Sequence, residues 1–114
     1  MAGPSDEEET AVRALTKAAR LNLAQAYLNI KEADKAMKHL RALGDDGSLK
    51  YSYRWAHGLM QLQDWTAAET AFKKAESLAD DKMKVAIQRD LALLQQRRKA
   101  AAQKEKQTWG KLFA

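Results

Sequence analysis

The side chains that most often do chemistry are few in this chain and are poorly spaced for catalysis. Cysteine is absent, which excludes disulfides, thiolate zinc sites and cysteine nucleophiles. His39 and His57 are the two histidines, and neither has a carboxylate or a third ligand at metal-binding spacing. The sequence contains no glycine-rich loop, nucleophile elbow or HExxH motif. We therefore expect a protein that is not an enzyme and that binds no metal or cofactor.

Two further groups of side chains are better explained by structure than by catalysis or base recognition. The acidic pairs at 45–46 and 80–81 fall where helices are expected to end, which predicts loop and cap residues. Tyr51, Tyr53 and Trp55 are spaced two apart, which puts them on different sides of a helix. That spacing favours core or groove packing over the stacking of nucleic-acid bases.

Charge is distributed unevenly along the 114 residues. Twenty Lys and Arg face fifteen Asp and Glu, a net charge of +5. Residues 82–114 carry nine basic and two acidic side chains, a charge of +7, so residues 1–81 carry −2. A basic tail can bind nucleic acid, acidic lipid or an acidic protein. It is equally typical of a helix face that is only exposed to solvent.

Length and hydropathy limit the class of protein further. A chain of 114 residues forms one domain with one modest core. No run of about 18 apolar residues is present, so no membrane span is expected. The acidic start MAGPSDEEE is unlike a signal peptide. These features predict a cytoplasmic protein and leave a nuclear location open.

Helix-forming residues dominate the chain. Ala, Leu, Lys, Gln and Glu fill nearly every long stretch, and the one proline is Pro4. Ser5 followed by Glu8 predicts a capping box at a helix start. A cluster of Gly, Asp and Ser over residues 44–48 predicts the clearest loop. Helices are expected over residues 6–30, 33–43, 49–62, 65–78 and from 82 almost to the end.

An internal repeat organises the middle of the chain. A shift of 32 residues places Ala24 on Ala56 and Ala36 on Ala68, so small residues recur where paired helices must approach closely. This pattern is similar to the tetratricopeptide repeat, whose usual period is about 34 residues. We therefore expect an all-α fold of tetratricopeptide-like helical hairpins closed by a long capping helix. Its predicted parts are a lead-in over 1–16, two hairpins over 17–81 and a basic C-terminal helix over 82–114.

An ordered set of short motifs runs from Leu21 to the end of the chain. Its members are Leu21-Asn22-Leu23-Ala24, Tyr27-Leu28, Ala36, Lys50, Tyr53-Arg54, Ala56, Gly58, Leu91-Ala92, Gln95-Gln96-Arg97, Lys104-Glu105-Lys106, Trp109, Lys111 and Phe113-Ala114. The set resembles the C-terminal repeat domain of the large immunophilins, the FKBP and cyclophilin co-chaperones, which usually have Tyr where this chain has Trp109. Any peptidyl-prolyl isomerase domain would lie outside this chain, and the first repeat of the family has no counterpart in residues 1–20.

The resemblance implies a peptide-binding groove. In this family the groove binds the acidic C-terminal tail of heat-shock protein 90 or its relatives through a clamp of Lys, Asn and Arg side chains. Three clamp positions match here, at Asn22, Lys50 and Arg54. Lys50 and Arg54 lie four residues apart, on one face of a helix, and Asn22 precedes Arg54 by one repeat period. The Arg fork and the Lys point charge both suit carboxylates.

One departure from the family leaves alternatives open. The family's first repeat supplies another Lys and Asn to the clamp, and no equivalent pair exists here. The chain is therefore interpreted as an excised fragment, as a protein whose first repeat diverged, or as one that has lost tail binding. In the last case we expect a scaffold or self-association domain that uses its basic C-terminal helix for partners.

The C-terminal helix is a second candidate interaction surface. A basic helix with sparse bulky anchors is typical of calmodulin targets and of membrane surfaces, and the family resemblance implies calmodulin binding. Trp109, Leu112 and Phe113 form an apolar cluster near the end of the chain, and a second copy of this chain is another expected partner for it. The simplest alternative is that the helix projects into solvent and binds nothing. Nucleic-acid binding is disfavoured because aromatic interleaving is poor. The candidate residues are Arg97, Arg98, Lys99, Trp109, Leu112 and Phe113.

Overall fold

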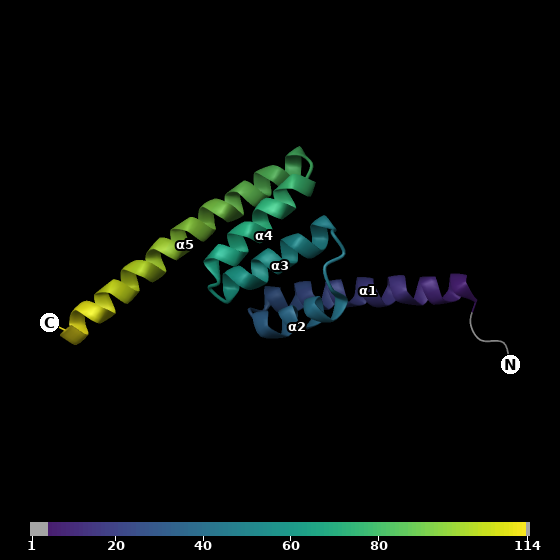
Figure 1. Ribbon diagram of the computed structural model, residues 1–114, viewed down its shortest axis with the longest axis horizontal. Coiled ribbons are helices and arrows are strands. Elements are labelled where there is room, and N and C mark those ends of the chain that lie inside the picture. The colour runs from purple at the N-terminus through teal and green to yellow at the C-terminus, as the bar shows by residue number, and fades with distance from the viewer. Residues whose placement is uncertain (1–4, 114) are drawn as a thin grey trace.

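The computed structural model describes residues 5–113, and Ala114 of the predicted tail motif lies outside them. Within this range the chain forms five helices and no strand (Figure 1). The all-α prediction is confirmed, and the helix ends differ from the expected ones by no more than one residue. No helix in the range is long and apolar enough to cross a membrane. The helices are α1 (Asp6–Asn29), α2 (Ala33–Leu43), α3 (Leu49–Gln61), α4 (Trp65–Leu78) and α5 (Asp81–Phe113).

Helix starts and loops follow from short polar side chains. Ser5 Oγ accepts a hydrogen bond from the backbone N–H of Glu8 at 3.1 Å, and four acidic residues in the first turn complement the positive helix end. In the loop before α3, Asp45 and Asp46 each accept a bond from a backbone N–H two residues on, at 2.8 and 2.9 Å. Asp80 accepts from the start of α5 at 2.8 Å. These acids are therefore loop and cap residues, as the sequence predicted.

The turns inside the two hairpins repeat each other at the level of the backbone. Lys31 and Gln63, one period of 32 residues apart, both have a φ of 64°, in the left-handed region. In each turn the N–H of the following residue donates to the carbonyl five residues earlier, at 2.8 Å in the first turn and 2.9 Å in the second. This pattern ends a helix tightly and reverses the chain. The period found in the sequence is thus a period of the structure.

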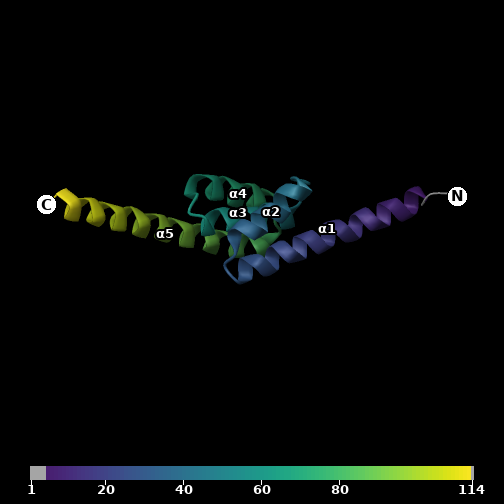
Figure 2. The same ribbon diagram turned by 90° about the horizontal axis from the view of Figure 1, so that it is seen from below.

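The small residues of the repeat lie where the helices pack. α1 pairs with α2, α3 pairs with α4, and α3 also contacts α1 and α2, which joins the two hairpins. Ala24, Ala56, Ala36 and Ala68 are completely buried. Figure 2 shows α2 and α4 on one side of the body, and α1 and α5 on the other.

The first half of α5 closes the stack. Ile87 and Leu94 are fully buried in a core cluster that they share with Phe72 of α4 and Ala56 of α3. Arg98 is tied to α4, because its Nη1 lies 3.1 Å from Oε2 of Glu69. The capping role expected of the last helix therefore belongs to its residues up to Arg98.

Both end helices extend beyond this body. The molecule measures 75 × 33 × 20 Å. Residues 5–19 are all exposed, and so are nearly all residues beyond Arg98. We call residues 6–16 the N-terminal arm and residues 99–113 the C-terminal arm. The arms leave the body in opposite directions, as Figure 1 shows.

Candidate peptide-binding groove

Helices α1 and α3 carry the three predicted clamp residues. Lys50 lies in the first turn of α3, Arg54 one turn further along the same helix, and Asn22 near the middle of α1. Arg54 Nε donates to Oε1 of Gln25 at 3.2 Å, which ties α3 to α1. Gln25 follows Asn22 by three residues and shares its face of α1. The three residues therefore border one surface, although no hydrogen bond joins any two of them within residues 5–113.

Arg54 is the chemically informative member of this set. Its side chain is half-buried, and burial lowers the pKa of its guanidinium, which still keeps its charge in proteins. Nη1 is buried and has no acceptor within the described residues. A buried donor without an acceptor costs about 1–3 kcal/mol. Gln25 orients the guanidinium plane through Nε, so an anion can meet only the part of the fork that stays exposed.

Asn22 and Lys50 surround Arg54 with exposed donors. Both side chains are exposed, and within residues 5–113 neither forms a hydrogen bond or an ion pair. Lys50 adds a mobile charge with three donors, and Asn22 adds an amide donor without charge. The arrangement provides one oriented guanidinium with two adaptable groups nearby, which suits a carboxylate.

Amide side chains continue the polar contacts of α1 with α3 beyond Arg54. Gln25 donates to Oδ1 of Asn29 at 2.9 Å, and Gln61 donates to the backbone oxygen of Leu28 at 2.9 Å. Oε1 of Gln61 is buried and has no donor within the described range. The sequence analysis missed all three amides. Their spacing could have indicated them. Gln25 and Asn29 lie one and two turns beyond Asn22 on α1, and Gln61 lies one period of 32 residues after Asn29.

The α5 side of α3 holds a cluster of ionisable side chains that was also missed. The Tyr53 hydroxyl donates to Oδ2 of Asp90, and Nε2 of His57 lies 3.3 Å from the same oxygen. Burial lowers the pKa of His57, against an opposing effect of Asp90. Burial, with the hydrogen bond to Asp90, raises the pKa of Tyr53. No group of three possible metal ligands occurs among residues 5–113.

The predicted tail residues separate into two kinds. Arg98 contacts α4, since it also donates from Nη2 to Oγ1 of Thr66 at 3.3 Å, and so it anchors α5. Arg97 and Lys99 are exposed beside it. Trp109 and Phe113 stack at 5.4 Å between ring centroids, and with Leu112 they form an exposed apolar end. The apolar end and the α4 anchor are therefore separate surfaces of one helix.

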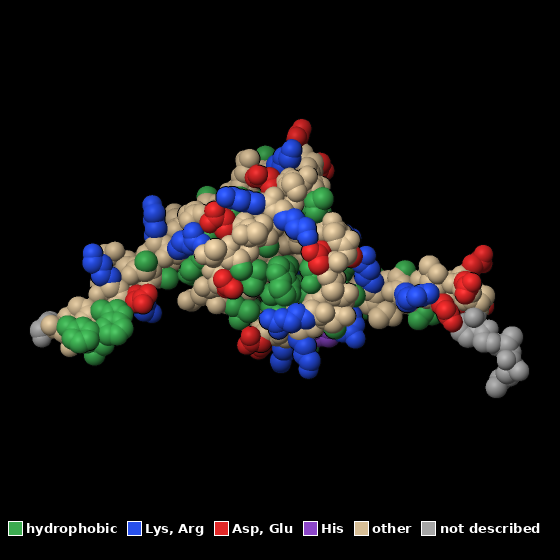
Figure 3. Space-filling view, in the orientation of Figure 1, with side chains coloured by type: hydrophobic (Ala, Val, Ile, Leu, Met, Phe, Trp, Pro, Cys, Tyr) green, Lys and Arg blue, Asp and Glu red, His purple; other side chains and the backbone are tan. Residues whose placement is uncertain are grey.

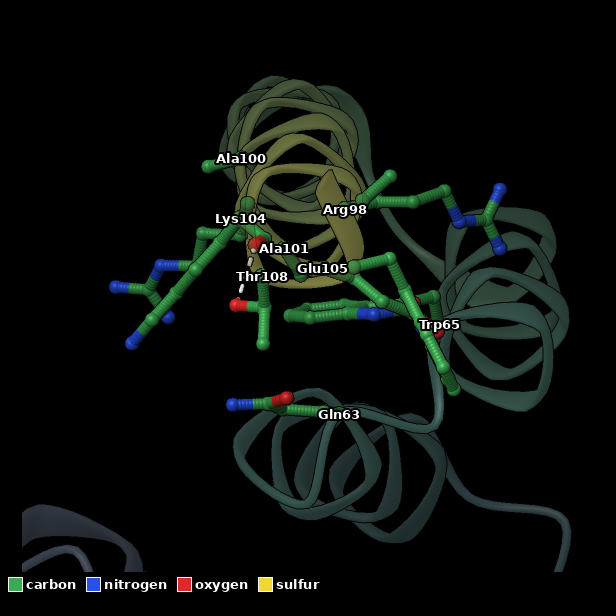
Figure 4. A pocket seen from close by; sticks show the side chains of 11 residues that line it. Gln63, Trp65, Arg98, Ala100, Ala101, Lys104, Glu105 and Thr108 are labelled. Atoms are coloured by element: carbon green, nitrogen blue, oxygen red, sulfur yellow. Dashed lines mark hydrogen bonds between the residues drawn. The ribbon is translucent and has the colours of Figure 1, made fainter. Parts of the chain in front are cut away.

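A hollow of about 790 Å³ lies away from the clamp residues, between α5 and the turn that joins α3 to α4. Figure 4 shows Gln63 of that turn and Trp65 at the start of α4 on one side, and Ala101, Lys104 and Thr108 of α5 on the other. A smaller hollow of about 360 Å³ is lined by Lys31, Gln61 and Arg97, among others. The larger hollow belongs to the base of the C-terminal arm and includes none of the three clamp residues.

Comparison with known proteins adds no family to this description. No family model matches the chain, and no curated protein matches it. The likeness to the repeat domain of the large immunophilins therefore stays a prediction from the sequence pattern. The structure itself shows an all-helical fold of hairpins.

Proposed function

We propose that the chain is a protein–protein interaction module of the immunophilin co-chaperone type. In this proposal it binds the acidic C-terminal peptide of a heat-shock chaperone in the groove between α1 and α3. The observation that carries the proposal is the half-buried guanidinium of Arg54 on α3, which Gln25 of α1 orients through Nε, beside the exposed side chains of Lys50 and Asn22. A terminal carboxylate has two oxygens in one plane and matches such a fork.

The charges near Arg54 support an acidic ligand. Lys50 lies one turn before it, and Lys31 and Arg97 are close enough to lower the pKa of His57. The carboxylate of Asp90, the nearby acid, already accepts a hydrogen bond from Tyr53. The groove therefore combines several cations with an acid whose oxygen is engaged. Because much of this charge is exposed, we expect binding to weaken with salt.

A matched pair of peptides tests the carboxylate requirement. A short acidic peptide carrying an N-terminal fluorophore is titrated with the full chain, once with a free C-terminal carboxylate and once as its amide. Loss of charge-assisted hydrogen bonds of about 1.5–3 kcal/mol predicts binding of the amide that is weaker by about tenfold or more. Equal binding of the two peptides, or no binding of either, would refute the clamp.

Three substitutions then locate the site. We expect Arg54→Ala and Lys50→Ala each to weaken binding of the free-acid peptide by about tenfold, and Asn22→Ala to weaken it less, because Asn carries no charge. Lys38→Ala is the matched control, since Lys38 is exposed on α2 and removes the same charge outside the groove. If Lys38→Ala weakened binding as much as Lys50→Ala, the attraction would come from overall charge and the clamp would be wrong.

A further inference from the structure

The two arms carry opposite charges. The N-terminal arm contains Asp6, Glu7, Glu8 and Glu9 against one base, Arg13, which gives −3. The C-terminal arm contains four lysines against one acid, Glu105, which gives +3. Figure 3 shows acidic side chains gathered near the described end of the N-terminal arm, and Lys and Arg side chains along the other arm. Each arm is therefore complementary to the other arm and repels its own kind.

Each arm also presents apolar side chains to solvent. Val12 and Leu15 are 61% and 71% exposed, and they lie three apart on one face of the N-terminal arm. Trp109, Leu112 and Phe113 are 53%, 68% and 78% exposed at the end of the C-terminal arm, where Figure 3 shows a compact apolar group. Neighbouring large apolar side chains that are exposed together on a projecting helix are typical of interaction sites.

The directions of the arms decide how two copies can meet. The arms leave the body in opposite directions along the long axis (Figures 1 and 2). A two-fold axis perpendicular to the long axis therefore places the N-terminal arm of each copy beside the C-terminal arm of the other. The two helices of each pair then run antiparallel with their ends together. Both pairs form at once, so the contact closes at two chains.

The order of charges along the arms agrees with this antiparallel arrangement. At a rise of 1.5 Å per residue, Arg13 lies about 10 Å from the start of α1, and Glu105 about 12 Å from the end of α5. The acidic first turn of one copy therefore lies beside Lys111 of the other, while Arg13 lies at the level of Glu105. Antiparallel pairing also sets the positive start of α1 against the negative end of α5.

We infer that two copies of this chain pair through their arms, with Val12 of each copy packed on Trp109 of the other and Leu15 next to this contact on the side of the body. The hollow beside Trp65 and Ala101 continues this contact towards the body. The arms contain none of Asn22, Lys50 and Arg54, so arm pairing can be tested separately from peptide binding.

Sedimentation of the full chain over a range from about 1 µM to about 1 mM tests the pairing. The expected result is a monomer–dimer equilibrium that shifts towards monomer as salt rises. The double variant with Val12→Ser and Leu15→Ser should raise the dissociation constant by about tenfold or more. Val85→Ser is the control, because Val85 is 57% exposed on the body part of α5. A monomer throughout, growth beyond two chains, or equal effects of both variants would overturn the inference.

A charge exchange tests which arms meet. One variant carries Glu7→Lys, Glu8→Lys and Glu9→Lys, so that both of its arms are basic. The other carries Lys104→Glu, Lys106→Glu and Lys111→Glu, so that both of its arms are acidic. Each variant alone should remain monomeric, and an equal mixture should form a mixed dimer. If either variant associated alone as the natural chain does, or if the mixture remained monomeric, arm-to-arm pairing would be wrong.

Discussion

Gly58 of α3 lies against Met37 of α2, and an ideal Cβ on this glycine would lie 2.3 Å from the methionine sulfur. Met37 is completely buried, so its side chain has little room to move aside. The close approach of α2 and α3, which joins the two hairpins, therefore depends on the absence of a side chain at position 58.

Gly58→Ala should lower the free energy of unfolding by about 1–3 kcal/mol, because the extra methyl overpacks the α2–α3 contact. Urea unfolding followed by far-UV circular dichroism measures this change. Gly110→Ala is the matched control, since Gly110 is also helical and has no atom within 4 Å of its added Cβ. There the higher helix propensity of Ala should leave stability unchanged or raise it. A neutral Gly58→Ala would contradict the packing described.

Tyr51 anchors the second hairpin to the first through a buried hydroxyl. Its hydroxyl donates to the backbone oxygen of Leu40 at 3.0 Å. Tyr51→Phe should lower the free energy of unfolding by about 1 kcal/mol, because the carbonyl at the end of α2 loses its buried donor. Tyr27→Phe is the control, as the Tyr27 hydroxyl forms no hydrogen bond within residues 5–113. Equal losses in the two variants would show that the bond to Leu40 contributes nothing.

His57 should make the fold sensitive to acid. Burial, together with the charges of Lys31 and Arg97, lowers its pKa in the folded state below 6.5, although Asp90 opposes this. The unfolded chain therefore takes up the proton first. The stability linked to this group is complete above about pH 6.5 and is lost as the pH falls below that value. Tyr53, which shares Asp90, stays neutral throughout this range, because its pKa is raised.

Urea unfolding between about pH 5 and pH 8 tests this linkage in two variants. His57→Gln should reduce the loss of stability on acidification. Asp90→Asn should increase it, because the charge that favours protonated His57 is removed. If the natural chain and His57→Gln lost the same stability over this range, His57 would not be the source of the acid sensitivity.

The left-handed turn residues offer a stabilising change. Gln63 has a φ of 64°, a conformation that costs a residue with a side chain roughly 1–2 kcal/mol and glycine almost nothing. Glycine also gives the unfolded chain more backbone entropy, which offsets part of this gain. Gln63→Gly should therefore raise the free energy of unfolding by up to about 1 kcal/mol. Lys38→Gly, inside helix α2, should lower it by about 1 kcal/mol. Thermal unfolding of both variants checks the opposite signs, and a destabilising Gln63→Gly would contradict the turn geometry.

The helices and their pairing could be predicted from the sequence because their causes are local or periodic. Caps such as Ser5 act within one turn, and small residues such as Ala24 and Ala56 recur at a fixed spacing. The period of 32 residues also placed Asn22 and Arg54 on adjacent helices. Fold class, helix ends and the contact between the helices that carry Asn22 and Arg54 could therefore be predicted from the sequence.

What only the tertiary structure decided involves groups that are far apart in the chain and have no periodic relation. Gln25 orients Arg54, Asp90 lies beside His57, and Arg98 is an anchor on Glu69 instead of a free tail cation. Each contact depends on the angle at which α1 or α5 packs against the hairpins, and that angle results from many side chains acting together. The opposite directions of the arms have the same origin, because they follow from where each end helix leaves the core.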